Sequence, residues 1–246
     1  MIVMKFGGTS VGTAESIRTA CRLVKDRLPR RPVVVVSAHN SPSCRMTDTL
    51  IDCAKQALKG HPDPERVFTL QRGVCRDLGL DTALIDPQLE EFARLLTGIC
   101  MIGELSPKTM DLVMSFGERM SSRVFAETLA KEFGVDARWQ TSYELGLLTD
   151  GNFGSAKPEK KNFSRLGENV AALGGEAVVT TGFLGKGPDG HITTLGRGGS
   201  DFSATIFGAA VQAEEVEIWT DVDGVMSADP KLVPAARSIP ELSFME

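Results

Sequence analysis

The sequence has few of the residues that build three common kinds of site. Its three histidines, His39, His61 and His191, are scattered, so they suggest neither a metal cluster nor a Ser-His-Asp set. Its five cysteines are odd in number and form no C-x-x-C pair, which argues against a disulfide framework and against a zinc site. We therefore expect reduced thiols and no histidine-based mechanism.

Long apolar runs and an excess of positive charge are also absent. No run approaches the about 18 apolar residues that span a bilayer, and the opening "MIVMKFGG" passes directly into glycines rather than into a signal-peptide core. The net charge of -5 gives no electrostatic reason to expect nucleic acid or a membrane surface as a partner. We predict a cytoplasmic protein in which positive charge for an anionic ligand is local.

The first 38 residues predict the start of an α/β domain. Residues 2–6, "IVMKF", are typical of a short apolar strand, and residues 13–28 have the apolar spacing of a helix. The unbroken β-branched run within 32–38 is typical of a strand buried on both faces of a parallel sheet. A strand, a glycine-rich turn, a helix and a strand in this order predict a βαβ unit.

Residues 47–133 have a helical pattern, with breaks at 60–64, 79–81 and 106–108. Strands are expected again at four later places, which are residues 135–141, 176–185, 191–196 and 215–222. With 42% hydrophobic and 24% charged residues, the chain has the composition of a globular protein with a sizeable core. We predict one α/β domain over residues 1–246 with a helical elaboration at about 47–133.

Two glycine-rich stretches are candidate anion sites. In "KFGGTSVG", Lys5 ends a strand and the glycines precede a helix, but the lysine comes before the glycines and not after them as in a Walker motif. In "GRGGSD", Arg197 and Asp201 flank two glycines and Ser200, immediately before a helical pattern. The plainer interpretations are a tight turn with a surface lysine and a helix capped by Ser200 or Asp201.

Two further clusters are acidic. Glu118 in "SFGERMSS" shares a helix face with small hydroxyl side chains and could receive an ammonium group, or could form a surface pair with Arg119 or Arg123. The segment "WTDVDGVMSADPKLVP" carries Asp221, Asp223 and Asp229 but lacks further ligands of a calcium loop.

Three of the four clusters are expected to follow strands of the same sheet, at the carboxyl edge where such folds bind ligands. Together the four clusters suggest sites for a nucleotide and an amino acid.

The joint order of these motifs resembles one family. "KFGGTSVG", "SFGERMSS", "LLTDGNFGSA", "TTGFLGKGPDGHITTLGRGGSDFSA" and "EIWTDVDGVMSADPKLVPAARSIPELSF" are similar to the aspartokinases of the amino-acid kinase family, over residues 1–246. The resemblance implies a three-layer αβα sandwich with a mainly parallel central sheet. It also implies phosphoryl transfer from MgATP to the side-chain carboxylate of L-aspartate, giving 4-phospho-L-aspartate and ADP, the entry to lysine, threonine and methionine synthesis.

This chemistry is consistent with the lack of a histidine set. A carboxylate with a pKa near 3.9 is ionised at neutral pH, so the nucleophile needs no general base. The reaction needs alignment of its partners and neutralisation of charge on the phosphoryl oxygens. ATP and Mg²⁺ are therefore the expected cofactors, with the metal carried by ATP and not by a dedicated protein site.

The resemblance also implies residue roles. Lys5 contacts the β- and γ-phosphates, Asp201 orients Lys5 or the metal, Glu118 receives the substrate ammonium, and Arg197 binds a substrate carboxylate. The remaining assignments are Gly7, Gly8, Thr9 and Ser10 in the phosphate loop, Thr47 and Ser200 at the substrate, and Thr220, Asp221, Met226 and Lys231 at the nucleotide.

The sequence departs from the family at four places. The loop after "VVVVSA" is longer than usual and has no glycine before Thr47. Met226 stands where tyrosine is common and Lys231 where arginine is frequent, so we expect an altered nucleotide affinity. Family members usually continue past "SFME" into a helix with an F-G-A-K stretch and into ACT regulatory domains, which we expect to be absent here.

Several alternatives stay open at this point. The acceptor could be acetylglutamate, glutamate or a nucleoside monophosphate. The chain could be a silent nucleotide-binding subunit that needs a partner or a further C-terminal segment, and a calcium-binding module is a third class. A homodimer and a separate regulatory subunit are both open as partners.

Overall fold

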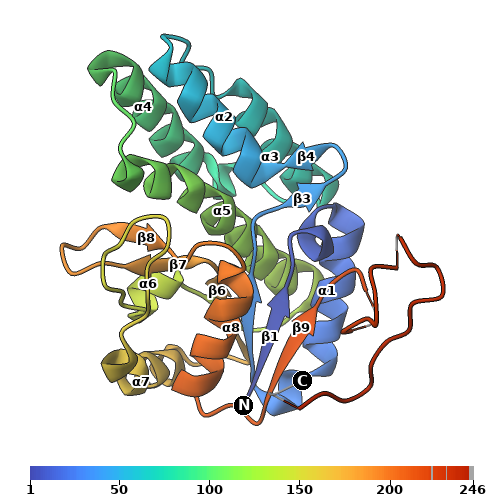
Figure 1. Cartoon of the computed structure of the whole chain (residues 1–246). Helices are drawn as coiled ribbons and strands as arrows, with labels where there is room; N and C mark the ends of the chain where they lie inside the picture. The colour runs from blue at the N-terminus through green and yellow to red at the C-terminus, as the bar shows by residue number, and fades with distance from the viewer. Residues whose placement is uncertain (223, 231, 244–246) are drawn as a thin grey trace.

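A computed structural model describes residues 1–222, 224–230 and 232–243 (Figure 1). Within these residues, the centre of the fold is a five-stranded sheet in the order β5-β6-β2-β1-β9, and every neighbouring pair is parallel. The strands are β1 (Ile2–Phe6), β2 (Pro32–Val36), β5 (Ala137–Trp139), β6 (Ala177–Thr181) and β9 (Glu215–Trp219). The predicted α/β class with a mainly parallel sheet is confirmed.

The register of the sheet brings the carboxyl ends of its central strands to one edge. Phe6 of β1 lies opposite Val36 of β2 and Trp219 of β9, and Val36 lies opposite Thr181 of β6. Because parallel strands all end at the same side, the loops that follow them gather there. In Figure 1 the strands run upward, so these loops lie near the middle of the molecule.

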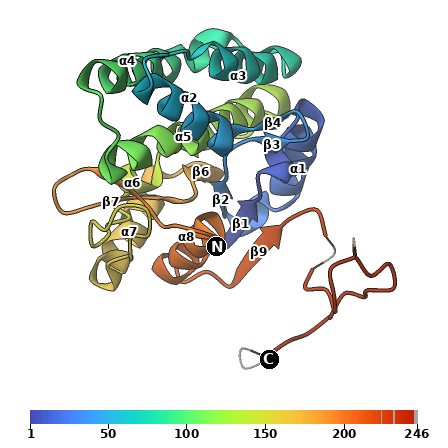
Figure 2. The same cartoon turned by 45° about the horizontal axis from the view of Figure 1, so that its top comes forward.

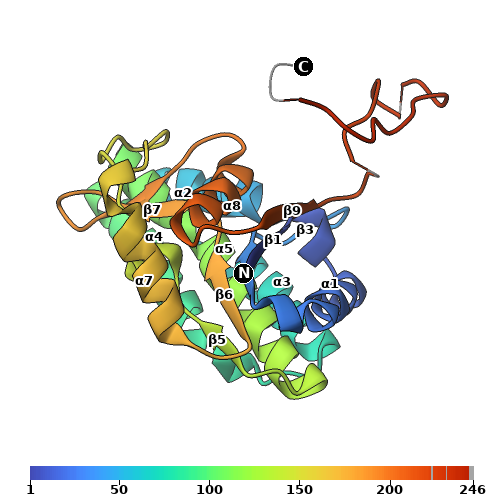
Figure 3. The ribbon, with the colours of Figure 1, turned by 90° about the horizontal axis from the view of Figure 1, so that it is seen from below.

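Helices cover both faces of the sheet and make three layers (Figure 3). Met4 and Phe6 pack toward α1 (Ala14–Asp26) and α5 (Pro107–Phe133). Val3 packs on the other face, toward α7 (Phe163–Leu173) and α8 (Gly199–Ala210). Side chains alternate along a strand, so Lys5 follows Val3 onto the α8 face. The side chain of Lys5, on a buried strand, therefore lies beside the first turn of α8.

The helices of residues 46–133 form a group beyond the carboxyl edge of the sheet, at the top of Figure 1. Besides α5, they are α2 (Met46–Leu58), α3 (Glu65–Asp77) and α4 (Asp86–Ile102). Helix α5 starts in this group, with Ser106 as N-cap and Pro107 in its first turn, and ends against the sheet. It thus joins the helical group to the sheet.

The prediction of one continuous strand over residues 176–185 is wrong. The structure breaks it into β6 and β7 (Leu184–Lys186), because Phe183 adopts a φ of 65° and the Leu184 N–H bonds back to the Gly182 carbonyl at 2.7 Å. Strand β7 pairs with β8 (Ile192–Thr194) in a separate antiparallel hairpin. The "GRGGSD" cluster therefore follows a hairpin strand and not a strand of the central sheet, contrary to prediction.

The remaining elements are short. A hairpin follows β2 and was not predicted. Its two strands, β3 (Asn40–Ser41) and β4 (Cys44–Arg45), have two residues each. The others are α6 (Ser142–Leu145) and the 3-10 turns Thr9–Val11, Leu28–Arg30, Thr82–Leu84 and Lys160–Asn162. Beyond β9, the described residues run away from the layers (Figure 2). In the described chain, no helix is both long and apolar enough to cross a bilayer.

Candidate active site

A cavity of about 300 Å³ lies over the carboxyl ends of β1 and β2. Several segments far apart in the sequence form it: the end of β1, the turn after β2, the start of α2, the turn between β6 and β7, and the start of α8 with the residues before it. A further contribution comes from the middle of α5. The lining residues are Lys5, Ser37, Thr47, Glu118, Phe183 and residues 196–201. The structure therefore brings together six of the residues that the sequence analysis assigned to substrate, phosphate or catalysis: Lys5, Thr47, Glu118, Arg197, Ser200 and Asp201.

Lys5 and Asp201 form an ion pair in this cavity. Lys5 Nζ lies 2.6 Å from Asp201 Oδ1, and the Lys5 side chain is 10% exposed whereas that of Asp201 is 55% exposed. A lysine held by a buried stem beside a half-exposed carboxylate can turn its other two N–H donors to an anion. Lys5 is therefore no surface residue, and the interpretation as a tight turn with a surface lysine is wrong.

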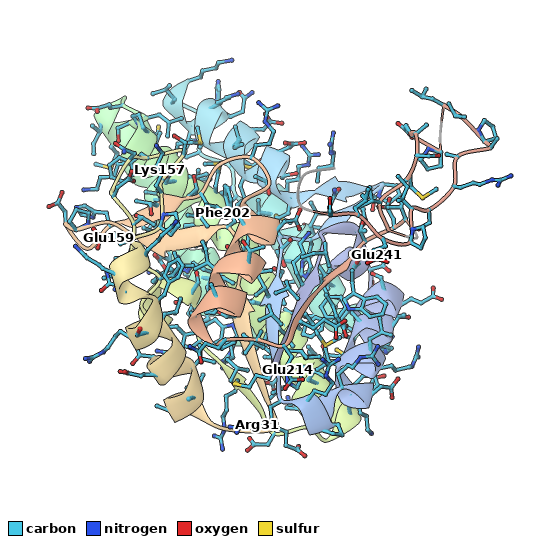
Figure 4. The ribbon with its side chains drawn as sticks, turned by 60° about the horizontal axis from the view of Figure 1, so that its bottom comes forward. Arg31, Lys157, Glu159, Phe202, Glu214 and Glu241 are labelled. Carbon is cyan, nitrogen blue, oxygen red and sulfur yellow. The ribbon has the colours of Figure 1, made fainter. Side chains whose placement is uncertain are left out.

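The start of α8 is open to a ligand. Its N-cap is Gly198, with a φ of 70°, and no side chain caps the helix. Ser200 and Asp201 lie inside the first turn, so the interpretation in which one of them caps the helix is wrong. A positive φ is available to glycine at little cost, and it leaves the helix N-terminus free of a Cβ. The first-turn N–H groups and the helix dipole favour an anion here. Phe202, the next residue, is 44% exposed at the start of α8 (Figure 4).

The turn after β1 is tied to the end of β9 and to β3. The Gly7 N–H donates to the Trp219 carbonyl at 3.2 Å, and the Ser10 hydroxyl donates to the same oxygen at 3.4 Å. On the other side, the Asn40 N–H donates to the Gly8 carbonyl at 3.0 Å. Thr9 begins the short 3-10 turn that leads to α1. The predicted phosphate loop is thus held against the carboxyl edge of the sheet.

The two glycines of this turn should respond differently to alanine. A Cβ on Gly8 would lie 2.8 Å from the Ala38 carbonyl oxygen, whereas one on Gly7 would meet nothing closer than Lys5 Nζ at 3.4 Å. We expect Gly8→Ala to lower the free energy of unfolding by about 1–3 kcal/mol, as overpacking does, and Gly7→Ala to change it by less than about 0.5 kcal/mol. Urea unfolding of both variants checks this, and equal effects would contradict it.

Glu118 is a buried carboxylate with one free oxygen. It is 4% exposed, and Oε1 accepts the Ala38 N–H at 3.2 Å, while Oε2 has no partner in the described structure. Burial raises the pKa of Glu118 to about 8, partly offset by backbone N–H donors. A Cβ on Gly117 would lie 2.7 Å from the Ala38 Cβ, so glycine at 117 permits this close approach of α5.

The alternative surface pairing of Glu118 is wrong. Arg119 pairs with Glu91 at 2.6 Å, and Arg123 stacks over the Trp139 ring. The neighbouring serine hydroxyls bind carbonyls and not the carboxylate: Ser121 donates to the Ser37 oxygen, and Ser122 donates to that of Glu118. The free oxygen is therefore available to a donor from a ligand.

The other residues that were predicted to bind the substrate, Arg197, Ser200 and Thr47, also line the cavity. Arg197 is exposed and forms no ion pair within the described parts of the chain. Ser200 packs over Gly182 at the end of β6, where a Cβ would lie 2.9 Å from its hydroxyl oxygen. Thr47, at the start of α2, also lines a neighbouring hollow of about 220 Å³ together with Gly8 and His39.

Of the predicted nucleotide residues after β9, the described ones (Thr220, Asp221 and Met226) do not line this cavity. Thr220 lies at a separate hollow of about 500 Å³ near α1, and its hydroxyl donates to Asp221 Oδ1 at 3.0 Å. Ser10 also lines this second hollow. Met226 pairs with Ser238 in the extended segment beyond β9. Lys231 lies outside the described residues, as does Asp223 of the acidic cluster.

Comparison with known proteins identifies the family. A family model described as "Amino acid kinase family" matches residues 1–246. The chain belongs to this family. Among curated amino acid kinases, "Aspartokinase 2, chloroplastic" of Arabidopsis thaliana is 36% identical over 99% of this chain and 46% of the relative. "Lysine-sensitive aspartokinase 3" of Escherichia coli (strain K12) is 32% identical over 100% of this chain and 54% of the relative.

Solved structures of the family agree. E. coli aspartokinase III in complex with aspartate and ADP (R-state) superposes with a TM-score of 0.78 and 31% identity, over 97% of this chain and 53% of that chain. The same enzyme with lysine and aspartate (T-state) gives 0.75 and 30%. The chain therefore spans about half the length of the amino acid kinases that it matches.

Two cavity residues of this amino acid kinase were missed from the sequence. Ser37 directly follows β2, and the rule that ligands bind beyond the carboxyl ends of parallel strands could have found it. Phe183 lines the cavity only because of the turn that separates β6 from β7. No local pattern predicts a phenylalanine with a positive φ, since bulky residues rarely adopt one.

Proposed function

We propose that the chain is the catalytic unit of an aspartokinase, which transfers the γ-phosphoryl group of MgATP to the side-chain carboxylate of L-aspartate. The observation that carries the proposal is one cavity that holds the Lys5–Asp201 pair, the free oxygen of Glu118 and the open start of α8. The similarity to aspartokinases, one of them solved with aspartate and ADP, supports the choice of substrates.

The reaction places its demands on charge and alignment. An oxygen of the substrate carboxylate attacks the γ-phosphorus, the bond from that phosphorus to the bridging oxygen breaks, and ADP leaves with the electron pair. Lys5 would bind phosphate oxygens, because its stem is buried and its ammonium group faces the cavity. The N–H groups at the start of α8 would add positive potential where charge develops.

Mg²⁺ fits this arrangement as a companion of the nucleotide. Asp201 offers a half-exposed carboxylate beside the phosphate-binding lysine, and Mg²⁺ is commonly held by one or two carboxylates together with phosphates and water. When bound, the metal would neutralise phosphate charge. Asp201 would orient both Lys5 and the metal.

The amino acid would be recognised at both ends of its backbone. Glu118 would accept the α-ammonium through its unpartnered oxygen, and Arg197 would bind the α-carboxylate. Ser200 and Thr47 line the same cavity and would position the acceptor side chain. Residues Thr220, Asp221, Met226 and Lys231 stay a prediction for the nucleotide.

Arg197→Ala should separate the two substrates. Because Arg197 is exposed and pairs with no other described residue, its loss should cost little stability. We expect the KM for aspartate to rise about 30-fold or more, as for a lost charge-assisted hydrogen bond, and the KM for MgATP to stay within about 3-fold. Steady-state kinetics with each substrate varied in turn tests this. Unchanged affinity for aspartate would show that Arg197 is not its carboxylate ligand.

The proposed function itself is tested by ADP release from MgATP with L-aspartate, acetylglutamate, glutamate, UMP or no acceptor. Hydroxylamine in the assay traps an acyl phosphate as a hydroxamate. Aspartate-dependent ADP with hydroxamate supports the proposal, whereas turnover with another acceptor assigns a different member of the family. ATP binding without any turnover would favour the alternative, a subunit that needs a partner or a further segment. A cytoplasmic location, a homodimer and a regulatory subunit stay predictions.

A further inference from the structure

Asp111 is a buried carboxylate outside the cavity, and the proposed reaction leaves it without a role. It is 1% exposed and lies on α5. Its Oδ2 accepts the Thr194 N–H at 2.8 Å and the Gly154 N–H at 2.9 Å, and its Oδ1 accepts the Thr194 hydroxyl at 2.9 Å. No cation in the described chain pairs with it. Three donors from two other segments thus converge on one carboxylate.

This arrangement requires an ionised carboxyl group. A carboxylate only accepts hydrogen bonds, so it can serve the N–H of Gly154 and both donors of Thr194 at once. Burial raises the pKa of Asp111, while the three donors oppose that shift. An asparagine of the same shape would turn an N–H₂ group toward one of these donors and leave it unsatisfied.

The contacts of Asp111 connect the two proposed recognition groups of the amino acid. Asp111 precedes Glu118 by seven residues of α5, about 10 Å along the axis and on nearly the same face. Thr194 ends β8 and precedes Arg197 by three residues. Asp111 therefore ties the strand that leads to Arg197 to the helix that carries Glu118.

The loop around Gly154 connects Asp111 to the residues before Arg197 a second time. The Gly154 N–H is held by Asp111, and the Gly154 carbonyl oxygen lies 3.1 Å from where a Cβ on Gly196 would stand. The Ala156 N–H also donates to the Thr194 carbonyl at 2.9 Å. The loop around Gly154 thus packs against Gly196, the residue immediately before Arg197.

We propose that Asp111 is a positioning residue that sets the distance between the ammonium-binding Glu118 and the carboxylate-binding Arg197, and so selects acceptors that carry both groups. The inference rests on the proposed function of the cavity. It assigns Asp111 no contact with either substrate. Its loss should therefore act on one substrate alone.

Asp111→Asn tests the inference, with Asp150→Asn as the matched control. Asp150 accepts the N–H groups of Asn152 and Lys157 in the same loop as Gly154, but it makes no bond to α5. We expect Asp111→Asn to raise the KM for aspartate at least about 10-fold, as for one or two lost buried hydrogen bonds, and the KM for MgATP by less than about 3-fold. Asp150→Asn should change both by less than about 3-fold.

A substrate analogue separates positioning from general loosening. β-Alanine is aspartate without the α-carboxylate, so it would use Glu118 but not Arg197. The inhibition constant of β-alanine should change less than about 3-fold in Asp111→Asn, while aspartate loses at least about 10-fold. An equal loss for both compounds, or for MgATP as well, would show a purely structural role and overturn the inference.

Thr194 provides a second variant in case Asp111→Asn does not fold. Thr194→Val removes only the hydroxyl bond to Asp111 and should raise the KM for aspartate about 3- to 10-fold, whereas Thr194→Ser should restore it. A valine variant with unchanged kinetics would overturn the inference. Wild-type protein without aspartate-dependent ADP release would instead overturn the proposed function, which keeps the two failures distinct.

Discussion

Replacing Lys5 by methionine should lower kcat by about a thousand-fold or more while the protein keeps its fold. Lys5 and Arg197 are the described cations that line the cavity, and only Lys5 lies on a strand of the central sheet, next to the turn of Gly7 and Gly8. Removing a preorganised positive group from a phosphoryl-transfer site commonly costs two to five powers of ten in rate, about 3–7 kcal/mol. Its loss would also expose the phosphates to the unpaired charge of Asp201.

The fold should tolerate this change, because methionine matches the apolar stem of the buried lysine and the ammonium group no longer has to be desolvated. Lys25→Met is the control, since Lys25 lies on the surface and donates only to the Phe133 carbonyl. Its kcat should stay within about 2-fold of wild type. Steady-state ADP release and thermal unfolding check both variants. If the Lys5→Met protein kept more than a tenth of the wild-type kcat, Lys5 would have no essential role in the reaction.

Glu118→Gln should weaken aspartate binding by about 100-fold and should remove a pH dependence that the wild type shows. Burial raises the pKa of Glu118 to about 8, so below that pH the free protein holds a proton on this carboxyl group. Binding an ammonium group requires the carboxylate. The KM for aspartate should therefore fall about tenfold per pH unit from pH 6 to 8 and level off above it.

Other charged or titratable side chains lie near Glu118. Lys5, Arg197 and Asp201 line the same cavity, and His39, Arg45 and Asp48 line the neighbouring hollow. Burial lowers the pKa of His39 to about 4, so His39 titrates below the pH range in question. Calorimetry in buffers of different ionisation enthalpy should show close to one proton released per aspartate bound at pH 7, and none for Glu118→Gln.

The raised pKa of Glu118 also makes the stability of the fold depend on pH. The pKa of Glu118 is higher in the folded protein than in the unfolded chain, so the protonated side chain adds to the free energy of unfolding. This stabilisation is complete below pH about 4.5 and is lost as the pH rises through 8. Glu118→Gln should therefore unfold at a higher temperature than wild type at pH 8–9. Glu127→Gln, on the same helix in a surface pair with Lys131, should leave the KM profile and the Tm unchanged. A flat wild-type profile would contradict the buried, protonated state.

The first strand and the glycine-rich segments were predictable because their signals are local. A five-residue apolar strand, a glycine turn and a helix follow one another within 26 residues, and the valine run of β2 indicates burial on both faces. The helix breaks near residues 60, 80 and 106 carry glycine or proline, which interrupt a helix wherever it packs. Lys5, Arg197 and Asp201 could be named as candidates for the same reason.

The hairpin of β7 and β8 was not predictable from local pattern. Residues 176–181 are typical of a strand, but the chain turns at Phe183, whose N–H donates to the Ser203 hydroxyl on α8 at 2.8 Å. That partner lies 20 residues further along the chain. A turn stabilised by a distant helix leaves no signature in its own residues.

By itself, the sequence determined the places of the five strands of the central sheet, the helical character of residues 47–133, the glycine turns, and which residue types could meet a nucleotide and an amino acid, because backbone preference and side-chain spacing act over a few residues. Only the tertiary structure decided that Glu118 is buried with a free oxygen, that Asp201 pairs with Lys5, and that Asp111 joins α5 to β8. Desolvation and hydrogen-bond partners come from segments about 80 to 200 residues apart. Their effect on a charge exists only once the layers have packed.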